Sequence, residues 1–258
     1  MPASAASALA RAKERGHRLF ICTGRSAPEV YPRFFDLGFE GIVGGAGGYA
    51  AVGSTVLLDE RMPAEHVQAL TRMWEELGAF YVWQGPDQMG PSRGYLDFFV
   101  PRAGENPQDW VEYGESVTPF VVDIEGGSFT KVTAYVRPEN ASMERISAAL
   151  PDGYRAIIGS VGAAGYVPFE VLPTRLSKAV GIEAVCKHLG IPLSRSVAIG
   201  DSNNDVEAVA RAGVGISIGD GCEALVEVAD IVAPAVGDDG FAWALAAAGL
   251  IDEAPNPA

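Results

Sequence analysis

The sequence has little positive charge and no long apolar run. Its 258 residues include 19 Lys and Arg against 33 Asp and Glu, which gives a net charge of −14. Nucleic acids and anionic membrane surfaces are bound chiefly through Lys and Arg, so this balance argues against both as main partners. No apolar stretch approaches the roughly 20 residues that cross a bilayer. We therefore expect no nucleic-acid partner and no membrane partner.

Cysteine and histidine are also scarce, with three of each in the chain. Cys22, Cys186 and Cys222 each lie in or beside an apolar segment, and no metal-site spacing links them. They are typical of reduced thiols in or near the core of a cytoplasmic protein. The Ser- and Ala-rich start faintly resembles a transit peptide, but a helix that ends at Gly16 explains it better. We expect a cytoplasmic protein.

Two common nucleotide-binding signatures are missing. No Gly-x-Gly-x-x-Gly follows a predicted strand, and no Gly-Lys-Ser/Thr of the Walker type occurs. The glycine cluster at residues 44–48 lacks the required spacing, and we expect a plain, flexible glycine turn there. A nucleotide-binding Rossmann domain is therefore the weakest of the functional hypotheses.

The most informative stretch that is present lies at residues 196–205. Residues 197–199 form a short apolar run that predicts a buried strand, and Gly200 permits a tight exit. Ser202 and Asp205 form a capping box that opens a helix. Asp201 and Asp205 thus meet at the carboxyl end of a strand, where open α/β sheets bind ligands. Two hard oxygen ligands in one turn suit Mg²⁺, although a solvated, capped turn is an ordinary alternative.

Short apolar strands alternate with helices over residues 1–61 and 169–258. This order predicts a doubly wound α/β core, with a parallel sheet covered by helices on both faces. A capping box at Ser26 and Glu29 predicts a helix that continues to about Leu37.

The middle of the chain, residues 62–168, has a different texture. It is rich in aromatic residues and in Pro- and Gly-containing turns, and it predicts an inserted antiparallel α+β domain whose aromatic side chains mostly form its own core. The expected strands include residues 95–100 and 130–136, and the expected helices lie near residues 64–77 and 142–150.

Three further positions can join the two aspartates. Thr23 and Gly24 follow the predicted strand at residues 19–22, and Lys178 opens a helix after the insert. Each signal is weak alone, because a Thr-Gly turn is usually only a turn and a Lys at a helix start is usually solvated. Their order along the chain is informative: strand and Thr-Gly, insert, Lys before a helix, then strand and Gly-Asp-x-x-Asn-Asp.

In this combination the chain resembles the haloacid dehalogenase superfamily of phosphatases, in particular its Cof-like branch with a C2-type cap. Thr23 resembles the second family motif, Lys178 the third, and residues 200–205 the fourth. The segments at residues 212–215, 228–230 and 239–241 are similar to the usual ending of the branch. The resemblance implies a Rossmann-like core and an α+β cap.

The resemblance also implies Mg²⁺-dependent hydrolysis of a phosphomonoester through an aspartyl-phosphate. Thr23 and Lys178 would be the catalytic residues, and Thr23, Gly24, Lys178 and Asn204 would bind the phosphate. Asp201 and Asp205 would bind the metal. The expected substrate is a small phosphorylated metabolite, such as a sugar phosphate, while the sequence indicates no oligomeric state.

The chain departs from the family pattern in two places. The family has an Asp-x-Asp-Gly-Thr nucleophile loop after an N-terminal strand, whereas residues 1–22 contain no Asp. We therefore expect the chain to be truncated at its N-terminus and to lack the first core strand. Residues 44–48 are Gly-Gly-Ala-Gly-Gly where the branch commonly has Asn-Gly-Ala near the substrate. The alternative hypothesis is a non-catalytic protein that binds phosphate or metal.

Overall fold

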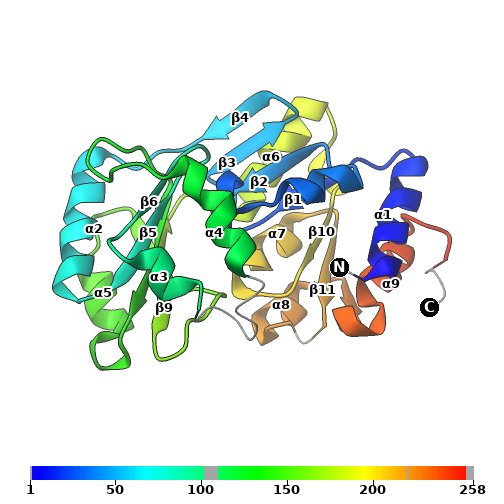
Figure 1. Ribbon diagram of the computed structural model, residues 1–258. Coiled ribbons are helices and arrows are strands. Elements are labelled where there is room, and N and C mark those ends of the chain that lie inside the picture. The colour runs from blue at the N-terminus through cyan, green and yellow to red at the C-terminus, as the bar shows by residue number, and fades with distance from the viewer. Residues whose placement is uncertain (1, 102–109, 220, 254–258) are drawn as a thin grey trace. The chain divides into compact units, whose positions relative to one another are not determined.

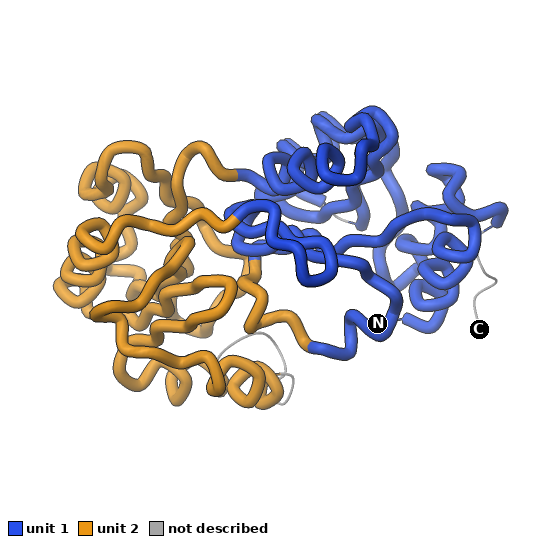
Figure 2. Tube along the Cα trace, turned by 90° about the horizontal axis from the view of Figure 1, so that it is seen from above, with its two compact units in different colours: residues 1–24, 32–58, 177–258 blue, residues 25–31, 59–176 orange. Residues whose placement is uncertain are grey.

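The computed structural model describes residues 2–101, 110–219 and 221–253, which form two compact units (Figure 2). The first unit comprises Met1–Gly24, Pro32–Leu58 and Ser177–Ala258, and the second comprises Arg25–Tyr31 and Asp59–Leu176. The second unit is therefore wider than the expected insert at residues 62–168. It also includes a short segment that directly follows Gly24.

The first unit contains two sheets and five α-helices among its described residues (Figure 1). Each of its strands contains Val or Ile, and each of its helices contains alanine. The strands are β1 (Phe20–Cys22), β2 (Gly41–Gly44), β3 (Tyr49–Val52), β4 (Thr55–Asp59), β10 (Val197–Gly200), β11 (Val214–Ile218) and β12 (Ile231–Ala233). The helices are α1 (Ala3–Glu14), α6 (Lys178–Leu189), α7 (Val206–Arg211), α8 (Glu223–Val228) and α9 (Gly240–Ala247).

The strand order of the two sheets places β1 and β10 each at one end. One sheet has the order β1-β2-β3-β4, in which β1 and β2 are parallel and β2 and β3 are antiparallel. The other has the order β10-β11-β12, and both pairs are parallel. The expected α/β alternation is thus present, but the described strands form two sheets and not one.

The helices of the first unit pack against both sheets, and the apolar clusters that they form contain residues of both. Ile182 of α6 packs with Ala198 of β10 in one cluster and with Val43 of β2 in another. On α1 and α9, a second set of buried side chains contacts both Leu19, beside β1, and Ile199 of β10. Because each set of helices contacts both sheets, α6 on one side and α1 with α9 on the other hold β1 and β10 in the same core.

The second unit is a five-stranded antiparallel sheet with the order β6-β5-β7-β9-β8. Strand β9 lies between β7 and β8, so the chain as far as Leu176 belongs to this unit. The strands are β5 (Phe80–Gln84), β6 (Met89–Pro91), β7 (Lys131–Val136), β8 (Tyr154–Ile158) and β9 (Val167–Pro173). The helices are α2 (Ala64–Glu76), α3 (Tyr95–Phe99), α4 (Val111–Val117) and α5 (Met143–Ala149).

Side chains alternate between the two faces of this sheet and build two cores. On one face, Trp83 of β5 and Trp74 of α2 lie in a cluster that also contains residues of α5. On the other face, Tyr135 of β7 packs against aromatic residues of α3 and α4. The aromatic residues of the middle segment therefore largely form its own core, as the composition predicts.

The prediction of a strand at residues 95–100 is wrong, because α3 occupies this segment. Gly94 adopts a left-handed conformation immediately before the helix. Tyr95, Phe98 and Phe99 are then buried on one helical face, within the cluster that contains Tyr135. Their spacing of three and four residues fits a helix, and packing overrides the β-propensity of the aromatic residues.

The prediction of one helix from residue 26 to about Leu37 is also wrong. The capping box of Ser26 and Glu29 is present, but it opens a single 3₁₀ turn at Ala27–Glu29. A second 3₁₀ segment covers Pro32–Leu37. The chain is already extended at Val30, and Pro32 disfavours helical conformation in the residue before it, Tyr31, so one continuous helix does not form.

None of the helices in the described part of the chain combines the length and the apolar character that a membrane crossing requires.

Candidate active site

The turn after β1 contains the first predicted site residues. The Thr23 backbone N–H donates to Val43 O (2.8 Å), and Thr23 O accepts from Ala46 N (3.3 Å). A Cβ added at Gly24 would lie 3.3 Å from Asn204 Nδ2, so this turn abuts the segment after β10. The structure thus brings Thr23, Gly24 and Asn204 together from residues far apart in the sequence.

The turn after β10 has the predicted capping box. Asp205 Oδ2 accepts hydrogen bonds from Ser202 N (3.2 Å), Ser202 Oγ (3.0 Å) and Asp201 N (3.3 Å). Gly200 is required for this geometry, because a Cβ there would lie 2.3 Å from Asp205 Cβ. The sequence therefore places the Asp205 carboxylate directly over the end of the strand.

Lys178 is the first residue of α6 and only 5% exposed, so it is not the solvated surface lysine of the ordinary case. Its Nζ donates to Asn204 Oδ1 (2.7 Å) and to Asp205 Oδ1 (2.6 Å). A buried ammonium needs such partners, because burial disfavours its charge. The pair joins the start of α6 to the turn after β10.

The two aspartates have different surroundings. Asp205 is 6% exposed and has hydrogen-bond partners on both oxygens, whereas Asp201 is exposed. No group of three His, Cys, Asp or Glu capable of holding a metal occurs in the described parts of the chain. Two carboxylates with the Asn204 amide oxygen nevertheless fit Mg²⁺ in donor type, since this ion is usually bound through one or two carboxylates plus water and substrate phosphate.

Cys22, at the end of β1, lies within the electrostatic influence of the ion pair. Burial is the main cause that raises the pKa of its thiol to about 12; Lys178 lowers this pKa and Asp205 raises it. The thiol therefore remains protonated at neutral pH and cannot serve as a thiolate nucleophile. Sequence reasoning placed Cys22 in or near the core but did not connect it with the site.

The glycine cluster at residues 44–48 also reaches the site. It forms a buried 3₁₀ turn in place of the expected flexible turn, and Gly45, Ala46 and Gly47 have positive φ. A Cβ at Gly47 would lie 1.8 Å from Ser177 O, so only glycine allows this approach to the start of α6. The run of glycines was the sequence signal for this close contact.

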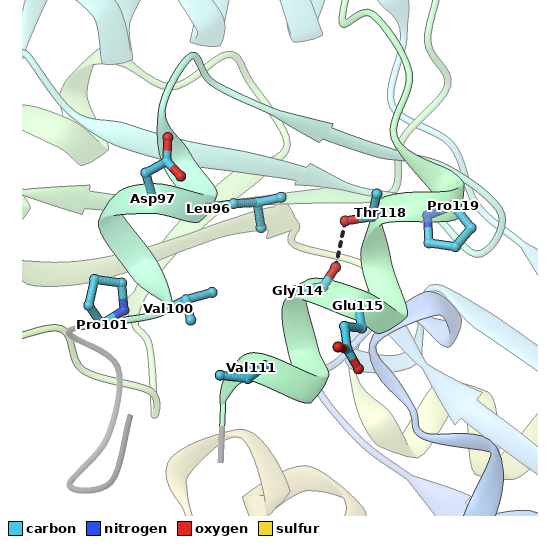
Figure 3. Close-up of a pocket in the computed structure, with 9 residues that line it drawn as sticks. All are labelled: Leu96, Asp97, Val100, Pro101, Val111, Gly114, Glu115, Thr118 and Pro119. Atoms are coloured by element: carbon cyan, nitrogen blue, oxygen red, sulfur yellow. Dashed lines mark hydrogen bonds between the residues drawn. The ribbon is translucent and has the colours of Figure 1, made fainter. Parts of the chain in front are cut away.

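A pocket in the second unit contains none of these residues. It has a volume of about 670 Å³ and lies between α3 and α4 (Figure 3). The apolar Leu96, Val100 and Val111 line it together with the acidic Asp97 and Glu115. Its lining contains no Lys or Arg, so it does not suit a phosphate.

Comparison with known proteins identifies relatives over nearly the whole chain. Residues 1–245 match the family model of the haloacid dehalogenase-like hydrolases. YkrA of Bacillus subtilis, whose name describes a candidate phosphatase, is 25% identical over 251 residues, which cover 97% of this chain and 92% of YkrA.

Solved structures share the fold. A hypothetical protein from Geobacillus kaustophilus is 26% identical, with a TM-score of 0.75 over 97% of this chain and 93% of the other. The subclass IIB sugar phosphatase BT4131 is 21% identical, with a TM-score of 0.76 over 97% and 93% of the two chains. Because the family model covers residues 1–245, the chain belongs to the haloacid dehalogenase-like hydrolases.

Proposed function

We propose that this protein is a Mg²⁺-dependent phosphatase that acts on a small phosphorylated metabolite, such as a sugar phosphate. The observation that carries the proposal is the buried position of Lys178, beside Asn204 and Asp205 and at the N-terminus of α6. A helix N-terminus favours an anion through its free N–H groups and its dipole. The names of YkrA and BT4131 support the same class of reaction.

In this proposal Lys178 and the Thr23 turn hold the phosphoryl group. The ammonium donates to phosphoryl oxygens, while the Thr23 hydroxyl and the backbone at Gly24 contact the same group from the end of β1. These donors are fixed before the ligand arrives, which is the condition for electrostatic stabilisation of a transferring phosphoryl group. Asn204 orients Lys178 through the 2.7 Å hydrogen bond to its Nζ.

Asp201 and Asp205 are the proposed metal ligands. A bound Mg²⁺ would neutralise charge on the transferring phosphoryl group. Asp201 is exposed and is therefore the more accessible of the two carboxylates. Asp205 is engaged with Lys178 and Ser202, so besides its proposed part as a metal ligand it holds the turn in shape.

The proposed nucleophile is an aspartate on an extended segment beside β1. Alternate residues of a parallel strand bond to opposite edges. Leu19 O accepts from Glu40 N (2.8 Å), and Thr23 N donates to Val43 O (2.8 Å), both on the β2 side. Phe20 therefore presents its backbone groups to the other edge, where a further parallel strand would end next to Thr23.

The same argument applies to β10. Ser196 O accepts from Val214 N (3.0 Å) on the β11 side, so Val197 and Ile199 present their backbone groups to the opposite edge. Thr23 directly follows β1, and Asp201 directly follows β10. An aspartate at the end of a strand between β1 and β10 would therefore lie close to both. A synthetic peptide of five apolar residues followed by Asp-Ile-Asp-Gly-Thr tests this, with a peptide whose first Asp is Asn as the control.

A second candidate function is phosphate or metal binding without turnover. Two observations favour it: residues 1–22 contain no Asp, and Lys178 is already paired with Asp205. This candidate predicts Mg²⁺-dependent binding of inorganic phosphate with no hydrolysis, with or without the peptide.

The test is hydrolysis of p-nitrophenyl phosphate by the 258-residue chain in Mg²⁺, with and without the peptide, beside calorimetry with inorganic phosphate. We expect Lys178→Ala and Asp201→Asn to abolish binding or turnover. The matched controls are Lys187→Ala, on the exposed end of the same helix, and Asp36→Asn, an exposed aspartate of the same unit. If the controls lose as much as the site variants, or if neither binding nor turnover occurs, the proposal is wrong.

A further inference from the structure

The chain that leaves the Thr23 turn enters the second unit at once. Thr23 and Gly24 belong to the first unit, while Arg25–Tyr31 belongs to the second, and the chain returns to the first at Pro32. One peptide bond therefore joins this seven-residue segment of the second unit to Gly24 of the first. The contacts that hold this segment in place can therefore influence the position of the Thr23 turn.

Glu29 anchors the segment through its buried carboxylate, and the residue is 5% exposed. Its Oε2 accepts hydrogen bonds from Ser26 N (2.8 Å), Ser26 Oγ (2.7 Å) and Gln84 Nε2 (2.7 Å). Its Oε1 accepts from Tyr113 OH (3.2 Å). The carboxylate thus connects the 3₁₀ turn at Ala27–Glu29 to both β5 and α4.

These four hydrogen-bond donors are uncharged, which bears on how the Glu29 carboxylate holds the segment. The first oxygen accepts three hydrogen bonds and the second accepts one, so a glutamine can keep the arrangement by turning its oxygen to the Ser26 side. Alanine at this position would leave the Gln84 amide and the Tyr113 hydroxyl without this acceptor, and buried donors are destabilised by the loss of an acceptor. The shape of the network, and not its charge, is what holds the segment.

Other contacts hold the same segment within the second unit. Ser116 Oγ donates to Pro28 O (2.8 Å), and the Arg25 guanidinium lies 5.3 Å from the ring centroid of Trp110. Because Glu29 is buried, its carboxylate needs these hydrogen bonds in place of water. The segment is therefore a fixed part of the second unit and not a loose connection.

The other phosphate-binding candidate has a similar position. Lys178 follows the crossing between Leu176 and Ser177 by one residue, and Leu176 O accepts a hydrogen bond from Arg155 Nη2 (2.9 Å) in the second unit. Thr23 and Lys178 thus each lie within two residues of a crossing whose far side is held by a side chain of the second unit. The chain therefore passes between the two units next to both proposed phosphate-binding residues.

We propose that Glu29 is a positioning residue for the candidate active site. By binding Gln84 and Tyr113 it fixes the chain that leaves the Thr23 turn, and so the contacts that Thr23 and Gly24 offer to a phosphoryl group depend on the second unit. This inference rests on the proposed function for its ligand, because it assigns Glu29 to the same site. The position of the Thr23 turn itself can be examined without a ligand.

The first test is amide hydrogen exchange followed by NMR in Glu29→Ala, Glu29→Gln and the wild type, without ligand. The reporters are the Thr23 N–H, bonded to Val43 O, and the Ala46 N–H, bonded to Thr23 O. We expect both to exchange at least tenfold faster in Glu29→Ala and within twofold of the wild type in Glu29→Gln. Unchanged exchange in Glu29→Ala would overturn the proposal.

Thr71→Val is the matched control, because it removes a hydrogen bond inside the second unit, from Trp83 Nε1 (3.0 Å), away from the crossing. We expect it to leave the Thr23 and Ala46 amides unchanged. If it accelerates them as Glu29→Ala does, general loosening of the second unit explains the effect and the positioning role is wrong.

The second test is calorimetry with inorganic phosphate in Mg²⁺. We expect at least fivefold weaker binding in Glu29→Ala and near wild-type binding in Glu29→Gln and Thr71→Val. Equal affinity in Glu29→Ala and the wild type would contradict the proposal. If the wild type binds no phosphate, the proposed function fails, and the exchange measurement still decides whether Glu29 positions the turn.

Discussion

Each unit of this protein contains a buried lysine–carboxylate pair, and the two pairs differ in their surroundings. In the first unit Lys178 and Asp205 are 2.6 Å apart, with side chains 6% and 9% exposed. In the second unit Lys131 and Glu170 are 2.5 Å apart, with side chains 2% and 10% exposed. By burial and distance alone the pairs are nearly the same.

The two pairs differ in the elements on which they lie. Lys178 opens a twelve-residue helix, and Asp205 lies in the turn after a parallel strand, where an anion is favoured. Lys131 and Glu170 lie on neighbouring antiparallel strands, β7 and β9, with no helix end at the pair. A buried ion pair is therefore weak evidence of function by itself, and its position at a strand end and helix start is what indicates a site.

The largest expected effect is that of Lys178→Met. Removing the ammonium leaves the buried Asp205 carboxylate without its ion-pair partner, which destabilises a protein by about 3–5 kcal/mol. The proposed phosphate ligand is lost as well. We expect a lower urea midpoint, measured by circular dichroism, and no detectable phosphate binding by calorimetry.

Lys187→Met is the control on the same helix, and we expect both measurements to match the wild type because Lys187 is exposed. If a folded Lys178→Met protein still binds phosphate, the pair of Lys178 and Asp205 has only a structural role, as we expect for Lys131 and Glu170.

The next effect is that of Lys131→Met. It leaves the Glu170 carboxylate unpaired and should destabilise the second unit by about 3 kcal/mol. Phosphate binding should stay unchanged, because neither residue of the pair is among the proposed phosphate or metal ligands. Tryptophan fluorescence during urea unfolding measures this, since Trp74, Trp83 and Trp110 lie in the second unit.

Replacing both partners, as in Lys131→Met with Glu170→Leu, should restore most of the lost stability, because no buried charge remains. A double variant no more stable than Lys131→Met would show that the second pair has a further role.

A smaller effect is expected for Gly47→Ala, which tests how the first pair is kept in place. The new Cβ would meet Ser177 O at 1.8 Å, beside Lys178, and Gly47 has a φ of +95°. Gly53→Ala is the matched control, because Gly53 also has positive φ (+55°) but has nothing within 4 Å. We expect Gly47→Ala to be about 2 kcal/mol less stable than Gly53→Ala, whose strain is about 1 kcal/mol, in urea unfolding. Equal losses would contradict the close contact.

Local patterns predicted most elements of the first unit and the capped turn after β10. The run at residues 197–199 and the box of Ser202 and Asp205 depend on neighbours in sequence, and the structure has both. The order of Thr23 and Lys178 along the chain indicated residues that the structure brings to the same sheet ends. These are short-range signals, which a sequence states directly.

The wrong strand at residues 95–100 and the missed partners of Glu29 concern tertiary contacts. The segment at residues 95–100 has β-propensity, yet Tyr95, Phe98 and Phe99 pack as one helical face. The partners of Glu29 are Gln84 and Tyr113, which lie 55 and 84 residues away, and no periodicity reports such a pairing. The sequence shows a capping box, while only the fold shows that Glu29 of this box also binds distant residues of the second unit.

The smallest expected effect is a pH dependence of stability centred on Cys22, which lies near the first pair. Burial raises the pKa of this thiol to about 12 in the folded protein, against about 8.5 for an exposed cysteine. The unfolded chain therefore loses the proton first, so the stability contribution is complete below about pH 8.5 and decreases as the pH rises towards 12. Each pH unit in this window should cost roughly 1 kcal/mol.

The measurement is the urea midpoint at pH 8 and pH 10 for the wild type and for Cys22→Ala. Other groups also titrate here, since burial raises the pKa of Tyr81 in the second unit to about 12. The difference between the two proteins isolates the thiol: the wild type should lose more stability than Cys22→Ala over these two units. Equal losses would mean that Cys22 is accessible in the folded state, and the packing between β1 and the Lys178 pair would then be looser than the core of the second unit.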